Sequence, residues 1–261
     1  MVAPGRRWRM ARDSGKNSKG LVDPLDRPMR FFVGTSGYSY PEWKGSFYPE
    51  KLPQKDMLSY YAQRLSTVEV NYTFRTIPSE RVVTSWAEQA PASFRFVLKA
   101  PRAITHDKRL TDVEELTDQF LIAAMALNGQ RGPLLFQLPP NFKKDLTRLE
   151  SFLKLIGKRA LSAFEFRHES WYDDEVVDCL RAHSCALCVA DVDDAPSTNL
   201  VRTTDWGYIR LRCEDYTEDQ LKEWVKRLGS QNWGEAYVFF KHEDTGTSPK
   251  LASRLLDLLK S

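Results

Sequence analysis

The chain contains only four cysteines in 261 residues, and no stretch of it stays apolar for long enough to cross a bilayer. Cys185 and Cys188 form one C-x-x-C pair, but no second pair accompanies them. The sequence therefore predicts neither a disulfide framework nor a four-cysteine zinc site. The N-terminal residues also lack the apolar core of a secretory signal. We expect a cytoplasmic protein that does not associate with membranes.

The chain also has little net charge, and its positive excess lies near the N-terminus. The whole sequence has a formal net charge of +3, whereas residues 1–30 contain eight Lys or Arg against three Asp. Gly, Ser and Asn separate these charges, which is a composition typical of disorder. We predict a disordered basic arm over residues 1–29 and one folded domain over residues 30–261. The arm is either a solvated extension or, as an alternative, a contact for nucleic acid.

Eight short apolar runs recur along the chain, and most are followed by a stretch with helical periodicity. The runs are Phe31–Ser36, Thr67–Asn71, Phe94–Lys99, Leu134–Gln137, Ala163–Arg167, Ala186–Asp191, Tyr208–Arg212 and Tyr237–Lys241. Strands that alternate with helices form parallel sheets, and eight such units in about 250 residues fit a closed barrel. We therefore predict the α/β class and a single-domain (β/α)8 TIM-type barrel. In that fold, the reaction chemistry lies where the C-terminal ends of the strands meet.

Helix starts are predicted by residues that can accept hydrogen bonds from free backbone N–H groups. Asp145 precedes one stretch of helical period, and Thr111 and Thr217 each begin a capping-box pattern. Residues 192–206 show no helical period. We therefore expect a short helix or a loop in place of one outer helix.

Alternation along the predicted strands identifies the side chains that point into the barrel. The inward charges at five strand ends are our candidate catalytic residues: Glu69, Lys99, Glu165, Asp191 and Lys241. Buried charges need partners, because the removal of each ion from water costs several kcal/mol. The set therefore fits either a structural ion network or a functional site. Its position at one mouth of the barrel favours function.

Cations outnumber carboxylates among the inward residues, which favours a small anionic ligand as the partner. Aromatic residues after the first strand could stack on a sugar or a base, or could simply pack the loop. The candidate ligand-binding residues are Ser36, Tyr38, Trp43, Asn71, His106, Gln137, Arg167, His168, Arg210 and Arg212.

Three histidines follow predicted strands near the carboxylates, as metal ligands do in some barrel enzymes. They are His106, His168 and His242. However, Lys99 and Arg167 would place positive charge in the same space, and no H-x-H or H-E-x-x-H spacing occurs. We therefore predict no metal ligand and no cofactor, with a divalent metal kept as the alternative.

Several segments resemble those of a known family. They are GTSGYSYPEW at 34–43, TVEVN at 67–71, FQLPP at 136–140, FEFRH at 164–168 and YIRL at 208–211. On these segments the chain resembles the YecE-like family, which is also called domain of unknown function 72. The resemblance implies a TIM-type barrel and implies no particular reaction. The chain departs from the family pattern at Arg75, at Arg212 and over residues 241–244.

The sequence favours an enzyme that binds a phosphorylated sugar or a nucleotide-like ligand and uses carboxylate acid–base chemistry, as a hydrolase, a lyase or an isomerase would. Glu165 would be the general acid or base, with Glu69 or Asp191 as its partner. A narrower form pairs Glu69 with Glu165 in glycoside hydrolysis. Lys99 and Lys241 would stabilise developing negative charge. The alternatives are a barrel that binds or processes nucleic acid and a scaffold without catalysis.

Overall fold

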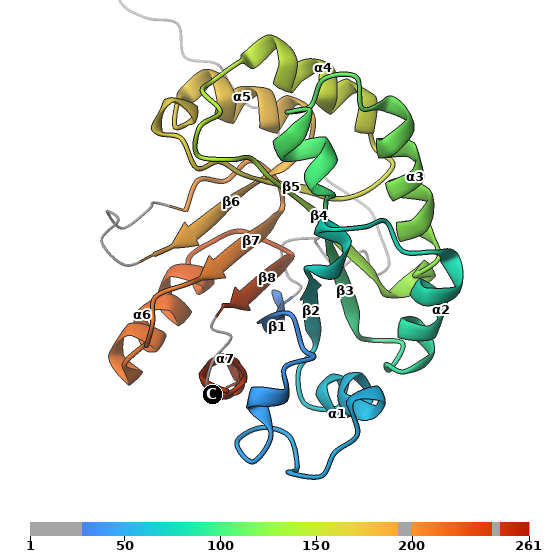
Figure 1. Ribbon diagram of the computed structural model, residues 1–261. Helices are drawn as coiled ribbons and strands as arrows, with labels where there is room; N and C mark the ends of the chain where they lie inside the picture. The colour runs from blue at the N-terminus through green and yellow to red at the C-terminus, as the bar shows by residue number, and fades with distance from the viewer. Residues whose placement is uncertain (1–27, 193–199, 242–245, 261) are drawn as a thin grey trace, which may run out of the picture.

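The computed structural model describes residues 28–192, 200–241 and 246–260, which form a closed barrel of eight parallel strands (Figure 1). The strands are β1 (Arg30–Ser36), β2 (Thr67–Val70), β3 (Arg95–Lys99), β4 (Arg131–Gln137), β5 (Ser162–Glu165), β6 (Ala186–Asp191), β7 (Trp206–Leu211) and β8 (Glu235–Phe240). Each strand pairs with the next along the chain, and β8 closes the barrel on β1, with Phe32 opposite Tyr237. The predicted (β/α)8 barrel is confirmed. The predicted basic arm lies almost wholly in residues 1–27, outside the described residues.

Helices on the outside of the barrel connect the strands (Figure 1). Those described are α1 (Met57–Ala62), α2 (Glu80–Glu88), α3 (Glu114–Met125), α4 (Leu146–Ile156), α5 (Asp174–Ala182), α6 (Glu218–Gly229) and α7 (Thr247–Lys260). Between β6 and β7, residues 192 and 200–205 are not helical, and residues 193–199 lie outside the described part of the chain. Among the described helices, none has the length and apolar character that a membrane crossing requires.

Two of the three predicted helix caps are present. Asp145 and Thr217 accept hydrogen bonds from backbone N–H groups in the first turns of α4 and α6, which those turns otherwise leave without partners. The prediction for Thr111 is wrong, because α3 begins after Val113 without a side-chain cap. Asp112 has a φ of 52°, so the chain turns between Thr111 and the helix.

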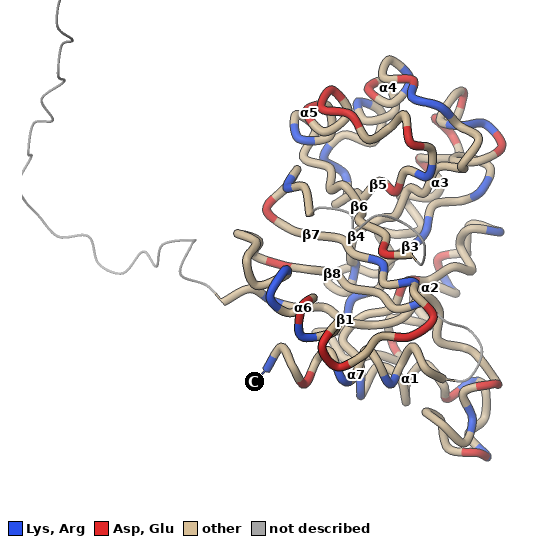
Figure 2. Tube along the Cα trace, turned by 90° about the vertical axis from the view of Figure 1, so that its left-hand side faces the viewer, with Lys and Arg blue, Asp and Glu red and all other residues tan. Residues whose placement is uncertain are grey.

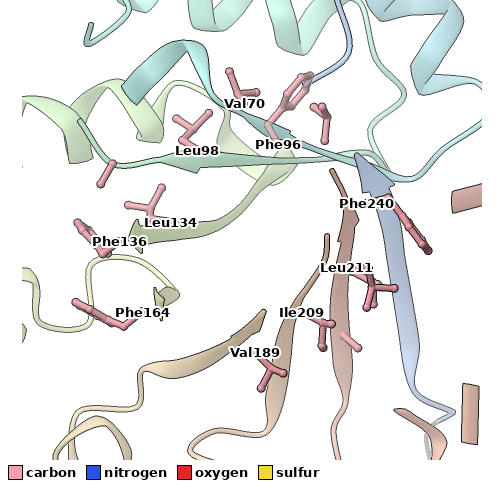
Figure 3. Packing of buried hydrophobic residues seen from close by; sticks show 14 of the residues in the cluster. Val70, Phe96, Leu98, Leu134, Phe136, Phe164, Val189, Ile209, Leu211 and Phe240 are labelled. Carbon is pink, nitrogen blue, oxygen red and sulfur yellow. The ribbon is translucent and has the colours of Figure 1, made fainter. Parts of the chain in front are cut away.

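Most of the apolar core lies between the barrel wall and the helices. Figure 3 shows part of it, with side chains such as Phe136 and Ile209 on the outer face of the strands. Alternate residues point into the barrel, where Phe32 stacks on Tyr237 with ring centroids 4.8 Å apart. This interior packing fills the barrel below its C-terminal end. A functional site therefore has its place at the C-terminal mouth.

Charged residues of both signs are spread around the barrel in the described part of the chain (Figure 2). Some form exposed ion pairs, such as Arg102 with Asp107. Pairs of this kind contribute only about 0–1 kcal/mol each to stability. The described surface is thus mixed in charge, which differs from the positive track that a nucleic-acid backbone selects.

Candidate functional site

An ion network lies at the C-terminal mouth of the barrel, centred on Arg210 of β7. Its guanidinium lies between two carboxylates, because it donates to Glu69 of β2 at 2.8 Å and also to Glu165 of β5. All three side chains are at most 2% exposed. The planar guanidinium can serve two carboxylates at once, and this pairing offsets the loss of hydration. The structure therefore brings together three residues that the sequence placed in the inward set.

Glu69 is held by donors from two further side chains. Ser36 of β1 donates through Oγ at 2.9 Å, and Tyr208 of β7 donates through Oη at 2.7 Å. Burial, and then the charge of Glu69, raise the pKa of Tyr208 well above its ordinary value. Tyr208 therefore keeps its proton and remains a donor. These contacts make Glu69 an anchor that holds Arg210 in place.

Glu165 is a buried carboxylate surrounded by cations. Burial alone would raise the pKa of Glu165, but the charges of Arg210 and Arg167 outweigh it and hold the pKa well below the ordinary value. Gln137, which lies opposite Glu165 in the register of β4 and β5, also lowers it. Glu165 is therefore ionised near neutral pH. This property argues against the expected role of Glu165 as a general acid or base, because an acid must carry a proton at the working pH and an effective base has a pKa near that pH.

Lys99 is the amine of the network, at the end of β3. Its ammonium lies 4.1 Å from the centroid of the Phe74 ring, and no carboxylate in the described part of the chain is close enough for an ion pair. Burial, and then the charge of Arg210, lower the pKa of Lys99 from 10.5 to about 8. An amine that titrates near neutral pH can both release and take up a proton. Lys99 therefore has the proton-transfer property that Glu165 lacks.

His106 also contacts the ring of Phe74. It lies on the π-helical turn Ala103–Asp107 that follows β3. Its ring packs edge-on against Phe74 with centroids 5.0 Å apart, and its Nδ1 lies 2.9 Å from Oγ1 of Thr105. Burial, and then the charge of Lys99, lower the pKa of His106 to about 4. His106 is thus neutral near pH 7 and adds hydrogen-bonding capacity rather than charge.

Arg167 and Arg212 form the partly exposed rim of the network. Their side chains are 32% and 23% exposed, and their guanidinium groups lie 3.0 Å and 3.9 Å from Glu165. The Nε atoms of Arg210 and Arg212 are buried, and the described residues offer neither of them an acceptor. With Lys99, four cations face the two carboxylates Glu69 and Glu165, which leaves a net charge of +2. The network therefore carries excess positive charge and two N–H donors that have no acceptor among the described residues.

Asp191 lies outside this network, which corrects the expectation that it points inward. Along β6, Cys188 points into the barrel, whereas Val189 belongs to the outer core. Asp191 shares the outward face with Val189. Its carboxylate accepts a hydrogen bond from Oη of Tyr216 at 2.9 Å. The sequence interpretation chose the wrong face of this strand, because both faces carry apolar side chains.

Trp43 and His168 serve packing and turn geometry. Trp43 is fully buried and stacks on Tyr48 with ring centroids 6.1 Å apart, so no face of the indole is open to a ligand. Nδ1 of His168 accepts the backbone N–H of Ser170 at 3.1 Å and caps the turn Glu169–Trp171. The packing alternative therefore accounts for Trp43, whereas His168 caps a turn.

Lys241 directly follows β8, where its backbone N–H donates to the carbonyl of Leu211 at 3.0 Å. It continues the inward row that Phe239 occupies, and its functional role stays a prediction. His242, one of the three metal candidates, lies outside the described residues. Within the described part of the chain, no three His, Cys, Asp or Glu side chains are grouped as a metal site.

Tyr38 and Asn71 line a separate cavity of about 530 Å³ on the rim of the mouth. Sequence reasoning missed three other residues of this lining, which are Tyr72, Arg75 and Trp86. Trp86 lies on α2 and borders the cavity from that helix. The available signal was the position of Tyr72 directly after Asn71 at the end of β2.

Comparison with known proteins finds relatives that match most of the chain. A family model described as "Protein of unknown function DUF72" matches residues 32–261. The UPF0759 protein YunF of Bacillus subtilis is 24% identical over 226 residues, covering 81% of this chain and 78% of YunF. The UPF0759 protein YecE of Escherichia coli K12 is 29% identical over 260 residues, covering 88% of this chain and 92% of YecE.

Solved structures share the barrel. A DUF72 family protein from Thermotoga maritima superposes with a TM-score of 0.77 at 28% identity, over 89% of this chain and all of that chain. A DUF72 family protein from Enterococcus faecalis gives a TM-score of 0.74 at 19% identity, over 88% of this chain and 96% of that chain. At the lower identity the likeness shows the fold alone. None of these descriptions states an activity.

Proposed function

The chain belongs to the DUF72 family, and we propose that it is an enzyme that binds a small anionic ligand at the C-terminal mouth of the barrel. The ligand class is a phosphorylated sugar or a nucleotide-like molecule. Hydrolases, lyases and isomerases that act on such ligands need groups that hold negative charge and a group that moves a proton. The ion network around Arg210 offers both kinds of group.

The buried guanidinium nitrogens of the network carry this proposal. Buried polar groups nearly always have hydrogen-bond partners, and an exception at a site points to an absent acceptor. The Nε atoms of Arg210 and Arg212 are two such exceptions in the described part of the chain. An anionic oxygen at the mouth would accept from these donors, and the net charge of +2 would stabilise it. Arg167, which is partly exposed, would complete the contact from the rim.

Lys99 is the proposed proton-transfer group. Its pKa of about 8 lies close to neutral pH, whereas Glu165 is held ionised by its neighbours. The two carboxylates would position Arg210 rather than exchange protons with the ligand. His106, which is neutral, would donate or accept one hydrogen bond beside Lys99. We thus assign proton transfer to Lys99, whereas the sequence analysis assigned it to the carboxylates.

Calorimetric titration with ribose 5-phosphate at pH 7 tests the anion site. The wild type should show saturable binding, and Arg167→Gln should weaken it at least about tenfold, because a charge-assisted hydrogen bond contributes about 1.5–3 kcal/mol. The matched control is Arg159→Gln, since Arg159 is also partly exposed but precedes β5 at the opposite end of the barrel. Absence of binding to the wild type, or equal weakening by both variants, would refute the anion site.

The position of the anion relative to Lys99 can be measured separately by NMR titration of the lysine side chain. A bound phosphate close to the ammonium stabilises the charged form, so saturating ribose 5-phosphate should raise the pKa of Lys99 above about 8. An unchanged pKa in the presence of bound ligand would contradict the role of Lys99.

The alternative function, contact with nucleic acid, depends on the basic residues 1–27, which lie outside the described residues. It is tested by binding of a fluorescent oligonucleotide at two salt concentrations, to the full chain and to a chain that begins at residue 28. Salt-dependent binding that the deletion abolishes would favour the arm as a nucleic-acid contact. Binding by neither chain would exclude this alternative.

A further inference from the structure

The cavity beside the ion network has the size and the lining of a small-molecule site. It measures about 530 Å³, within the range of roughly 300–1,000 Å³ that ligand pockets span. Its wall is formed by the loop after β1, the end of β2 and one side of α2, which contribute Tyr38, Asn71 and Trp86. Gly37 shapes the entry to this wall, because its φ of 90° suits glycine and a Cβ there would lie 2.3 Å from Oη of Tyr40.

Two aromatic rings form a corner in this cavity. Tyr72 and Trp86 lie edge to face, with centroids 6.3 Å apart and planes at 88°. Tyr72 is 55% exposed, so much of its ring is open to solvent. A planar ring can stack on one of these side chains while its edge meets the other. The apolar side chains of Val70 and Val82 complete the lining around this corner.

Polar groups without partners stand next to the aromatic corner. Within the described residues, the exposed guanidinium of Arg75 forms no ion pair, and the partly exposed side-chain amide of Asn71 forms no hydrogen bond. An amide offers both a donor and an acceptor, and a guanidinium offers donors only. These are the groups that read the polar edge of a heterocyclic base, whereas a sugar phosphate would leave the aromatic corner unused.

One short turn joins this cavity to the ion network. The 3₁₀ turn Tyr72–Phe74 presents Tyr72 to the cavity, and Phe74 lies under the ammonium of Lys99. Asn71 continues the face of β2 that carries Glu69, the anchor of Arg210. A ligand that spans both places needs a planar ring at one end and a negative charge at the other.

We propose that the aromatic cavity binds the base of a nucleoside 5′-monophosphate whose phosphate occupies the cationic mouth. This inference rests on the proposed function for the phosphate end, and it selects the nucleotide-like ligand over the sugar phosphate. Tyr72 and Trp86 stack on the base, while Asn71 and Arg75 contact its polar edge.

Calorimetry with three kinds of probe tests the two ends of the ligand separately. The probes are the four common nucleoside 5′-monophosphates, ribose 5-phosphate, which lacks the base, and adenosine, which lacks the phosphate. At least one nucleotide should bind about tenfold more tightly than ribose 5-phosphate, because stacking of a base on an aromatic side chain supplies a factor of this size or more. Tyr72→Ala should remove this difference and leave the affinity for ribose 5-phosphate unchanged.

Met125→Ala is the matched control, since Met125 is 61% exposed and lies on α3, away from the cavity. It should leave all affinities unchanged. Equal affinity of the wild type for ribose 5-phosphate and every nucleotide would overturn the base site and leave the anion site standing. Adenosine binding that Tyr72→Ala weakens, without binding of ribose 5-phosphate, would keep the base site and refute the anion site. No binding of any probe would refute both.

Discussion

Replacement of Lys99 by methionine should stabilise the protein, because Lys99 is a charge held in an unfavourable place. Burial and the nearby charge of Arg210 lower its pKa from 10.5 to about 8. At pH 7 Lys99 is protonated in both the folded and the unfolded chain. The lowered pKa therefore corresponds to a free energy of unfolding that is about 3 kcal/mol smaller than it would be with an unshifted lysine. Methionine has a similar length and carries no charge.

The gain in the free energy of unfolding should be smaller than about 3 kcal/mol, since the variant also loses the contact of the ammonium with the Phe74 ring. That contact is worth about 1–2 kcal/mol at a partly desolvated position. We therefore expect Lys99→Met to raise the free energy of unfolding at pH 7 by about 1–2 kcal/mol. The same change should abolish the proton-transfer role. A variant that is more stable and inactive is the expected sign of a strained functional group.

The pH dependence gives the sharper test. Between about pH 8 and pH 10.5 the folded chain has lost the proton of Lys99, whereas the unfolded chain still binds it. The free energy of unfolding of the wild type therefore rises with pH in this window relative to the variant. The advantage of Lys99→Met should be full below about pH 8 and should vanish near pH 10.5.

Urea unfolding followed by circular dichroism at pH 7, 8, 9 and 10 measures the difference in free energy of unfolding between the wild type and Lys99→Met. Groups that titrate alike in both proteins do not contribute to this difference. Lys51→Met is the control, because Lys51 is exposed and should change stability by less than about 0.5 kcal/mol. A destabilised Lys99→Met variant, or a difference that does not depend on pH, would refute the reasoning from the ion network.

Two further changes test the supporting structure. Glu69→Gln should lower the free energy of unfolding by about 3 kcal/mol, because Arg210 then keeps only one of its two buried carboxylates. Urea unfolding measures this loss, and the additional change Arg210→Met should recover part of it. Asp145→Ala should cost about 1 kcal/mol through loss of the cap on α4, seen as a lower Tm, and an unchanged Tm would show that the cap contributes nothing.

Much of the fold could be predicted from local patterns. The eight apolar runs became the eight strands with ends shifted by a few residues, and Asp145 capped its helix as expected. These features depend on residues close together in the chain. Thr111 failed because a turn with positive φ at Asp112 separates it from α3, and a spacing rule does not contain that backbone conformation.

The candidate site was predicted in part, for the same reason. Strand alternation brought Glu69, Lys99 and Glu165 to one mouth, because each lies on a strand whose two faces differ clearly in polarity. Asp191 was misplaced because β6 is apolar on both faces, so alternation does not distinguish them. The cavity that Tyr72 and Trp86 line was missed, because its walls come from a turn and a helix that only packing brings together.

The amino-acid sequence alone thus determines the number and order of the strands, the closure of the barrel and the sign of the charges at its mouth, since these follow from local periodicity and composition. The tertiary structure alone decides which charged group can move a proton. Arg210 lies 141 residues from Glu69 and 45 residues from Glu165 along the chain. The pKa values of Lys99 and Glu165 depend on burial and on distances between such remote residues, and these exist only after the barrel has closed.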